Sequence, residues 1–156
     1  MSQDMDRSAV IETLNKVLEF ELAGVVRYTH YSLMVFGPYR QPIVTWLEEQ
    51  ASESLLHARQ AGEMLTQLGA HPSLGIGKLL ETHDHDVESI LRESLDHERA
   101  TLQQYWHLKN LVEGHSVMLE EYARTMISQE EQHCGEVDRM LRKPGDLDPV
   151  VPGLMA

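Results

Sequence analysis

Residues 126–140 read MISQEEQHCGEVDRM and combine helical periodicity with polar side chains in an unexpected place. Positions spaced alternately three and four apart lie on one face of an α-helix. Extended a little towards the N-terminus, this face reads Leu119, Ala123, Met126, Glu130, His133, Val137 and Met140. The face is apolar except for Glu130 and His133. The segment therefore predicts a helix that carries a carboxylate and an imidazole, three residues apart, inside its apolar stripe.

Three further segments have the same periodicity, and each stripe contains one such side chain near its middle. Residues 8–36 place Glu21 there, residues 42–68 place His57, and residues 84–112 place Glu98. The quoted segment itself is expected to span residues 116–142. No segment alternates as a strand does, so the sequence predicts an all-α fold with four helices.

The connections between these segments predict how the helices are arranged. Gly37-Pro38 and residues 113–115 are short turns, which make the first and second helices, and likewise the third and fourth, antiparallel neighbours. Residues 70–83 are rich in Gly and Pro and can carry the chain along the bundle. We therefore predict an antiparallel four-helix bundle over residues 1–143 with one long crossover between helices two and three. Residues 144–156 contain Pro149 and Pro152 and are expected to be a non-helical tail.

Composition narrows the class of protein. The 156 residues suit one domain, and 13 Lys and Arg against 25 Asp and Glu give a net charge of −12. An acidic surface argues against nucleic acid as a partner. No window is long and apolar enough for a membrane span, and Cys134 is the only cysteine. We expect a cytoplasmic protein with no membrane partner.

The polar side chains in the four stripes point to a metal site. A single Glu in such a stripe usually reaches water at its edge, and a lone His is usually a core residue with a hydrogen-bond partner. Several buried carboxylates together are costly, however, unless a cation offsets their repulsion. Glu and His side chains from four facing helices match the ligand set of di-iron and di-manganese bundles. The combination predicts a pair of metal ions inside the bundle.

These residues resemble the bacterioferritins over roughly residues 10–141. The resemblance is carried by NKVLEFELAGVVRYTHYSLM (15–34), EQASESLLHARQ (49–60), ILRESLDHERATLQ (90–103) and SQEEQHCGEVDRML (128–141). It implies a ferritin-like bundle that binds two iron ions and oxidises Fe²⁺ with O₂ or peroxide, in iron storage or detoxification. It also implies a homo-oligomer. Manganese or another divalent metal remains possible.

The resemblance also implies roles for individual residues. Glu21 and Glu98 correspond to the terminal ligands of the first and third helices. His57 corresponds to the His of the first Glu-x-x-His motif, and Glu130 and His133 correspond to the second such motif. Tyr28 corresponds to a tyrosine beside the metals. We expect Glu98, with or without Glu53, to bridge the two ions. The expected metal ligands and catalytic residues are thus Glu21, Glu53, His57, Glu98, Glu130 and His133, with Tyr28 beside them.

Three departures from the family bear on this expectation. Ser54 stands where the family has a bridging Glu, and the adjacent Glu53 is the residue that could replace it. Leu55 stands where the family has the Met that binds haem, so we expect no haem there. The Pro-containing tail lacks the short fifth helix that helps to build a cage, so both a dimer and a cage stay open as the form of the homo-oligomer. The alternative function is therefore a non-catalytic ferritin-like subunit with a degraded metal site.

Three other parts of the sequence each have a functional and a simpler structural interpretation. Glu49 and Glu53, four residues apart, form either a secondary iron site or, as we prefer, a solvated acidic face. Residues 83–86 read His-Asp-His-Asp and form either a metal site or, more simply, a helix N-cap with acidic residues. Cys134 is expected to be a packed or exposed thiol that points away from His133.

Overall fold

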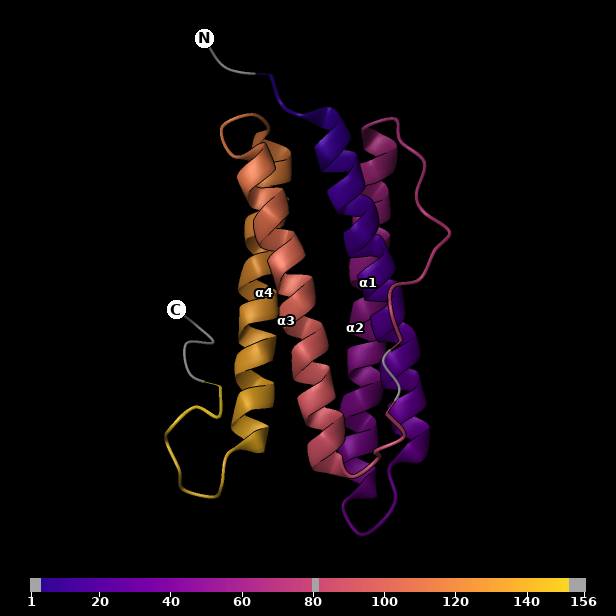
Figure 1. The fold of residues 1–156 in the computed structure, drawn as a ribbon, viewed down its shortest axis with the longest axis vertical. Coiled ribbons are helices and arrows are strands. Elements are labelled where there is room, and N and C mark those ends of the chain that lie inside the picture. Colours follow the sequence, from indigo (N-terminus) through magenta and orange to yellow (C-terminus); the bar gives the residue numbers. More distant parts are fainter. Residues whose placement is uncertain (1–3, 80–81, 152–156) are drawn as a thin grey trace.

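Four long helices account for most of the chain in the computed structural model, which describes residues 4–79 and 82–151. They are α1 (Arg7–Met34), α2 (Arg40–Gln67), α3 (Val87–Val112) and α4 (Val117–Leu141). Figure 1 shows α1 beside α2 and α3 beside α4, with all four axes nearly parallel to the long axis of the molecule. The described residues contain no strand. The predicted all-α four-helix bundle is confirmed.

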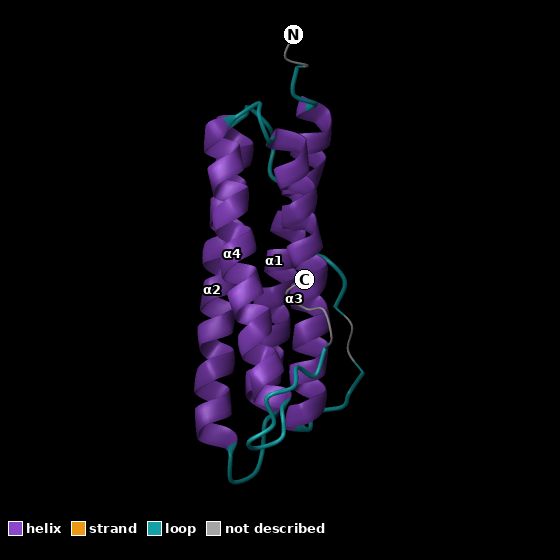
Figure 2. Ribbon diagram, turned by 90° about the vertical axis from the view of Figure 1, so that its left-hand side faces the viewer, coloured by secondary structure: helices purple, strands orange, loops and turns teal. Residues whose placement is uncertain are grey.

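The connection between α2 and α3 runs the length of the bundle. It leaves the end of α2 and descends along the outside of α1 to the opposite end, where α3 begins (Figures 1 and 2). The backbone N–H of Gly77 donates a hydrogen bond of 2.9 Å to the carbonyl of Glu19 on α1. The N–H of Ser73 donates one of 2.8 Å to Oδ1 of Asn15. The predicted crossover is therefore present and is attached to α1.

Helix ends differ from the predicted ones by up to three residues, and side-chain caps fix the observed starts of α1 and α3. The third helix was expected from Asp84, but Asp86 is the N-cap and its carboxylate accepts a hydrogen bond from the N–H of Ser89. The first helix was expected from Ser8, but Asp6 caps it through the N–H of Ala9. The chain is already extended at Val35, so α1 ends two residues before the expected Phe36.

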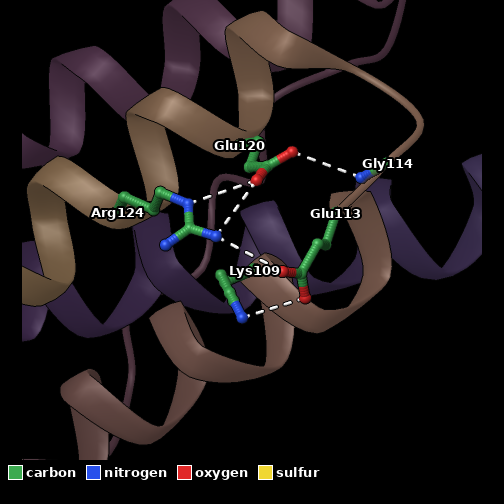
Figure 3. A network of polar contacts seen from close by, with 5 residues as sticks. All are labelled: Lys109, Glu113, Gly114, Glu120 and Arg124. Atoms are coloured by element: carbon green, nitrogen blue, oxygen red, sulfur yellow. Dashed lines mark hydrogen bonds and ion pairs between the residues drawn. The ribbon is translucent and has the colours of Figure 1, made fainter.

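The short turn between α3 and α4 is held by charged side chains (Figure 3). Glu113 accepts from Lys109 at 2.9 Å and from Arg124 at 3.3 Å. Arg124 also binds Glu120, whose other oxygen accepts from the N–H of Gly114 at 3.2 Å. Gly114 has φ 78°, in the left-handed region that favours glycine. This network ties the start of α4 to the end of α3.

Apolar side chains fill the two ends of the bundle and leave a polar layer between them. One cluster contains Leu14, Leu65, Leu108 and Leu119, and others at the opposite end contain Leu47, Ile90, Leu95 and Val137. The predicted site residues lie between these clusters along the helices. No helix within the described ranges is long and apolar enough to cross a membrane.

The chain after α4 packs back onto that helix. Residues 142–151 are not helical, and the N–H of Val151 donates a hydrogen bond of 2.9 Å to Oδ2 of Asp138. Residues 152–156, the rest of the expected tail, lie outside the described residues. A domain boundary at residue 144 stays a prediction.

Candidate metal centre

The four helices each contribute a buried polar side chain to one layer of the bundle. Glu21 on α1 is 2% exposed, His57 on α2 is 4%, Glu98 on α3 is 3%, and Glu130 on α4 is 2%. His133, one turn after Glu130, is half-buried. Each residue lies on the apolar face of its helix, so packing of the helices forces the side chains together in the interior.

Glu21, His57 and Glu130 form a first group. Nδ1 of His57 lies 3.6 Å from Oε1 of Glu21 and 3.3 Å from Oε1 of Glu130. One ligand atom from each of the three residues lies within 4.8 Å of the others. This spacing is suited to a single ion with two carboxylate ligands and one imidazole.

Glu98, Glu130 and His133 form a second group by the same criterion, again within 4.8 Å. Glu130 is therefore common to both groups, although the sequence had led us to expect Glu98 as the bridge. A carboxylate has two oxygens, so one residue can serve two neighbouring ions. The arrangement offers two adjacent sites that share one side chain.

Two tyrosines fix the outer carboxylates. The hydroxyl of Tyr28 donates a hydrogen bond of 2.5 Å to Oε1 of Glu98, as its expected place beside the metals suggests. The hydroxyl of Tyr105 donates one of 3.0 Å to Oε1 of Glu21. The sequence analysis did not assign Tyr105 to the site, although it occupies the same stripe as Glu98, two turns later. Both hydroxyls orient an acid within the buried layer.

Burial and mutual repulsion shift the pKa values of these acids. Burial, opposed by a hydrogen bond with His57, raises the pKa of Glu21 to about 7. Burial together with the negative charge of Glu98 raises the pKa of Glu130 well above its ordinary value. Burial also acts to raise the pKa of Glu98, but interactions with Glu130, His133, His97 and Tyr28 outweigh it and lower that pKa to about 2. Without a cation, the cluster therefore keeps protons on Glu130 and Glu21 at mildly acidic pH.

Two buried atoms of the cluster have no hydrogen-bond partner. They are Oε2 of Glu130 and Nε2 of His133. An orphaned polar atom in the interior normally costs about 1–3 kcal/mol. A cation between these atoms would give both a partner and would replace the protons on the acids, so the residues present fit a metal centre.

Glu53 lies at the rim of this centre. Its side chain is 45% exposed, and its Oε1 is 3.6 Å from Nε2 of His57. It lines a pocket of about 270 Å³ between α2 and α4 together with His133, Gln50 and Glu136. Oε1 of Gln50 is another buried acceptor without a partner. Glu53 is thus close to the centre but less enclosed than the other acids.

Ser54 faces α1 at the same level. Its side chain is buried, and its hydroxyl oxygen is 2.8 Å from the point that a Cβ atom on Gly24 would occupy, so a larger residue there would displace it. Nε2 of His97, a half-buried residue of α3, approaches the same glycine. Burial lowers the pKa of His97, which keeps the ring neutral. The sequence analysis did not single out His97 or Gly24.

The remaining sequence candidates lie apart from this centre. Glu49 joins neither ligand group among the described residues. Leu55 is partly exposed on α2, and its side chain cannot bind haem iron. Cys134 is fully buried in an apolar cluster, and burial raises the pKa of its thiol to about 12, so it is packed and unreactive.

The sequence matches the family described as Ferritin-like domain over residues 11–144. Among solved structures, a ferritin-like, diiron-carboxylate protein from Bacillus anthracis is 28% identical, with a TM-score of 0.83 over 91% of this chain and 100% of that one. A dodecameric thioferritin, the bacterioferritin-related protein of Bacteroides fragilis, is 23% identical with a TM-score of 0.82, over 88% of this chain and 87% of that one.

The bacterioferritin of Rhodobacter capsulatus is 21% identical with a TM-score of 0.77, over 90% of this chain and 86% of that one. A comparison with curated proteins gives no significant match. The family match covers most of the helical bundle, including every acid of the buried layer. The chain belongs to the ferritin-like domain family.

Proposed function

We propose that this protein binds a pair of iron ions in the buried layer and oxidises Fe²⁺ with O₂ or peroxide. The observation that supports the proposal is the position of Glu130, which belongs to both ligand groups at once. The neighbour from Bacillus anthracis is described as a diiron-carboxylate protein, and it is similar to this chain over nearly its whole length.

Two sets of residues would hold the ions. Glu21 and His57 would bind one ion, Glu98 and His133 the other, and Glu130 would bind both. A ligand set of carboxylates and imidazoles is suited to iron and to manganese. It is less suited to metals that prefer thiolate ligands or oxygen ligands alone. When bound, the iron pair would supply two electrons, which with two protons reduce O₂ to H₂O₂, or peroxide to two water molecules.

The protein's own groups prepare the site for this reaction. Glu130 and Glu21 would release their protons as cations arrive, because the raised pKa values reflect burial without a compensating charge. Tyr28 holds Glu98 through its short hydrogen bond and limits the rotation of that carboxylate. Tyr28 and Trp46 also lie beside the His133 ring, with centroids 6.4 and 6.1 Å away, and limit its movement.

Glu53 has a different role in this proposal. Because it is half-exposed and faces His57 from the pocket between α2 and α4, it would receive Fe²⁺ from solvent and pass it inward. It would also supply a mobile sixth ligand in place of the carboxylate that Ser54 lacks. The centre would then be asymmetric, with an exchangeable ligand on the side of His57.

The chain is also expected to form a homo-oligomer. The outer faces of α1 and α2 expose four aliphatic side chains: Val26, Leu33, Leu55 and Leu56. Adjacent exposed apolar residues favour association. The structural neighbour from Bacteroides fragilis is described as a dodecamer, whereas the size of the assembly here is to be measured, for example by sedimentation equilibrium.

Oxygen consumption after addition of Fe²⁺ to metal-free protein tests the proposed activity. The wild type is expected to consume O₂ faster than the buffer, and Glu130→Gln is expected to lose most of this rate. Glu49→Gln is the matched control, because Glu49 is also on α2 but outside both groups.

The alternative, a non-catalytic ferritin-like subunit, gives a different result. It predicts no rate above the buffer in the wild type or in Ser54→Glu, and no change in thermal stability with Fe²⁺. A site that binds the ion stabilises the folded state by mass action, so the two functions are separable even when turnover is slow.

A further inference from the structure

A cluster of histidines lies where the crossover reaches the far end of α1, outside the buried acid layer. His30 is in the last part of α1, while His83 and His85 are in the segment that leads into α3. Nε2 of His30 and Nε2 of His85 are 3.3 Å apart. The ring centroids of His83 and His85 are 6.4 Å apart. Two imidazoles from distant parts of the chain therefore meet at one place, with a third ring nearby.

We propose that His30 and His85, with His83 beside them, bind a divalent transition-metal ion such as Zn²⁺. Two imidazole nitrogens on a tetrahedral zinc ion, each about 2.0–2.1 Å from the metal, are about 3.3–3.4 Å from each other. The observed separation of 3.3 Å matches this value. At this distance the two rings can also share a proton in a hydrogen bond, which an ion would displace.

The positions of these histidines are set before any metal arrives. Asp86 caps α3, which fixes the residue that follows His85. Thr82 donates a hydrogen bond to Glu93, and Glu93 also accepts one of 2.6 Å from the hydroxyl of Tyr31. The segment is therefore anchored on both sides of the cluster. A preorganised site loses less conformational entropy on binding, which favours affinity.

His83 would supply a third ligand. It has a left-handed backbone conformation with φ 61°, which histidine adopts more readily than most residues with a Cβ atom. It is exposed, so its ring can move towards an ion held by the other two without disturbing the core. Water would complete a four-coordinate shell.

The ligand type decides which ions this site takes. Imidazole nitrogens suit Zn²⁺, Ni²⁺ and Cu²⁺, whereas carboxylate-rich sites suit harder ions. The histidine site and the buried acid layer would thus differ in preference. The ion would also link the crossover to α1, so its binding stabilises the connection between the two halves of the bundle.

Zinc titration of the metal-free, full-length protein at neutral pH tests the proposal. His30→Ala and His85→Ala are each expected to weaken one Zn²⁺ site per chain by at least about tenfold. His107→Ala is the control, because His107 is exposed on α3 and far along the helix from the cluster. Glu130→Gln should leave this site intact while it weakens binding in the acid layer.

A second measurement observes the histidines directly in the Glu130→Gln protein, in which binding to the acid layer is weakened. The side-chain nitrogen resonances of His30 and His85 are expected to shift on addition of one equivalent of Zn²⁺ to the Glu130→Gln protein. Unchanged Zn²⁺ affinity in both histidine variants, with resonances that do not move, would overturn the proposal. Because this outcome concerns residues outside the acid layer, it leaves the proposed oxidation of Fe²⁺ unaffected.

Discussion

The hydroxyl oxygen of Ser54 lies 2.8 Å from the point that a Cβ atom on Gly24 would occupy. The two residues, one on α2 and one on α1, both have small side chains, and the two helices approach each other closely at this point. Nε2 of His97 lies 3.1 Å from the same point, so a third helix contacts this glycine beside the metal centre. Ser54, the residue that we expected to lack a bridging carboxylate, is thus packed against α1.

Gly24→Ala is expected to destabilise the protein by about 1–3 kcal/mol, as overpacking of a tight contact does. The added methyl group would force the hydroxyl of Ser54, and to a lesser extent the ring of His97, to shift. Chemical denaturation measures the change. The double variant Gly24→Ala, Ser54→Ala should recover part of it, because the shorter of the two contacts is then removed.

Gly62→Ala is the matched substitution at a helical glycine of α2. No atom lies within 4 Å of the Cβ that it would add. Alanine has the higher helix propensity, so we expect this variant to be stabilised by up to about 1 kcal/mol. Equal effects at Gly24 and Gly62 would contradict the contact described above.

Tyr28→Phe is expected to lower the stability of the metal-free protein by about 1.5–3 kcal/mol, the usual contribution of a hydrogen bond to a charged group. The variant keeps the ring and removes only the donor to Glu98. Denaturation at constant pH measures the loss. Tyr39→Phe, at an exposed tyrosine, is the control, and a Tyr28→Phe protein no less stable than this control would exclude an ionised Glu98 at that bond.

The metal-free protein should become less stable as the pH rises from 4.5 to 7. Glu21 has a folded-state pKa of about 7 against an ordinary value of 4.5. In this window the folded state keeps a proton that the unfolded state has lost, so stability falls with pH, by about 3 kcal/mol from this group. The pKa of Glu130 is also raised, and the hydrogen bond with Glu21 raises the pKa of His57. Both groups therefore also make the folded protein less stable as the pH rises.

Thermal unfolding of the chelator-treated protein across this pH range measures the trend, and Glu21→Gln should reduce it. Saturating Fe²⁺ under argon should reverse the sign, because metal binding requires the deprotonated acids. A metal-free protein whose stability increases from pH 5 to 7 would show that these carboxylates are ionised in the folded state.

Ser54→Glu and Glu53→Gln distinguish the two possible sources of a sixth ligand. Adding a buried carboxylate at position 54 should destabilise the metal-free protein by more than about 2 kcal/mol, and Fe²⁺ should recover most of the loss.

Glu53→Gln should weaken Fe²⁺ binding while leaving metal-free stability within about 0.5 kcal/mol, since Glu53 is half-exposed. Unchanged Fe²⁺ affinity in Glu53→Gln would remove this residue from the proposed centre.

The sequence was sufficient to predict the bundle and four ionisable residues of the buried layer, Glu21, His57, Glu98 and Glu130. Glu21, Glu98 and Glu130 interrupt apolar stripes of helical period, and periodicity alone determines which side of a helix is buried. The turns and the length of residues 70–83 indicated the crossover. Helix ends were less accurate because caps such as Asp86 compete with nearby candidates such as Asp84, and only the hydrogen bond to Ser89 decides between them.

Contacts between helices could not be read from one sequence. The role of Gly24 depends on Ser54 and His97, and the hydrogen bond from Tyr105 to Glu21 joins residues that are far apart in the chain. Periodicity gives the face of each helix but not its axial shift against its neighbours. For the same reason the pairing of His30 with His85 emerged only from the structure, although the His-Asp-His-Asp segment was visible beforehand.

Equilibrium binding of Fe²⁺ under argon to the metal-free wild type and to Glu130→Gln tests the central claim most directly. Because Glu130 belongs to both ligand groups, we predict that the substitution removes two Fe²⁺ ions per chain together. The control Glu49→Gln should bind as many ions as the wild type. Loss of no ion from Glu130→Gln, or a wild type that binds none, would contradict a two-metal centre in the buried layer.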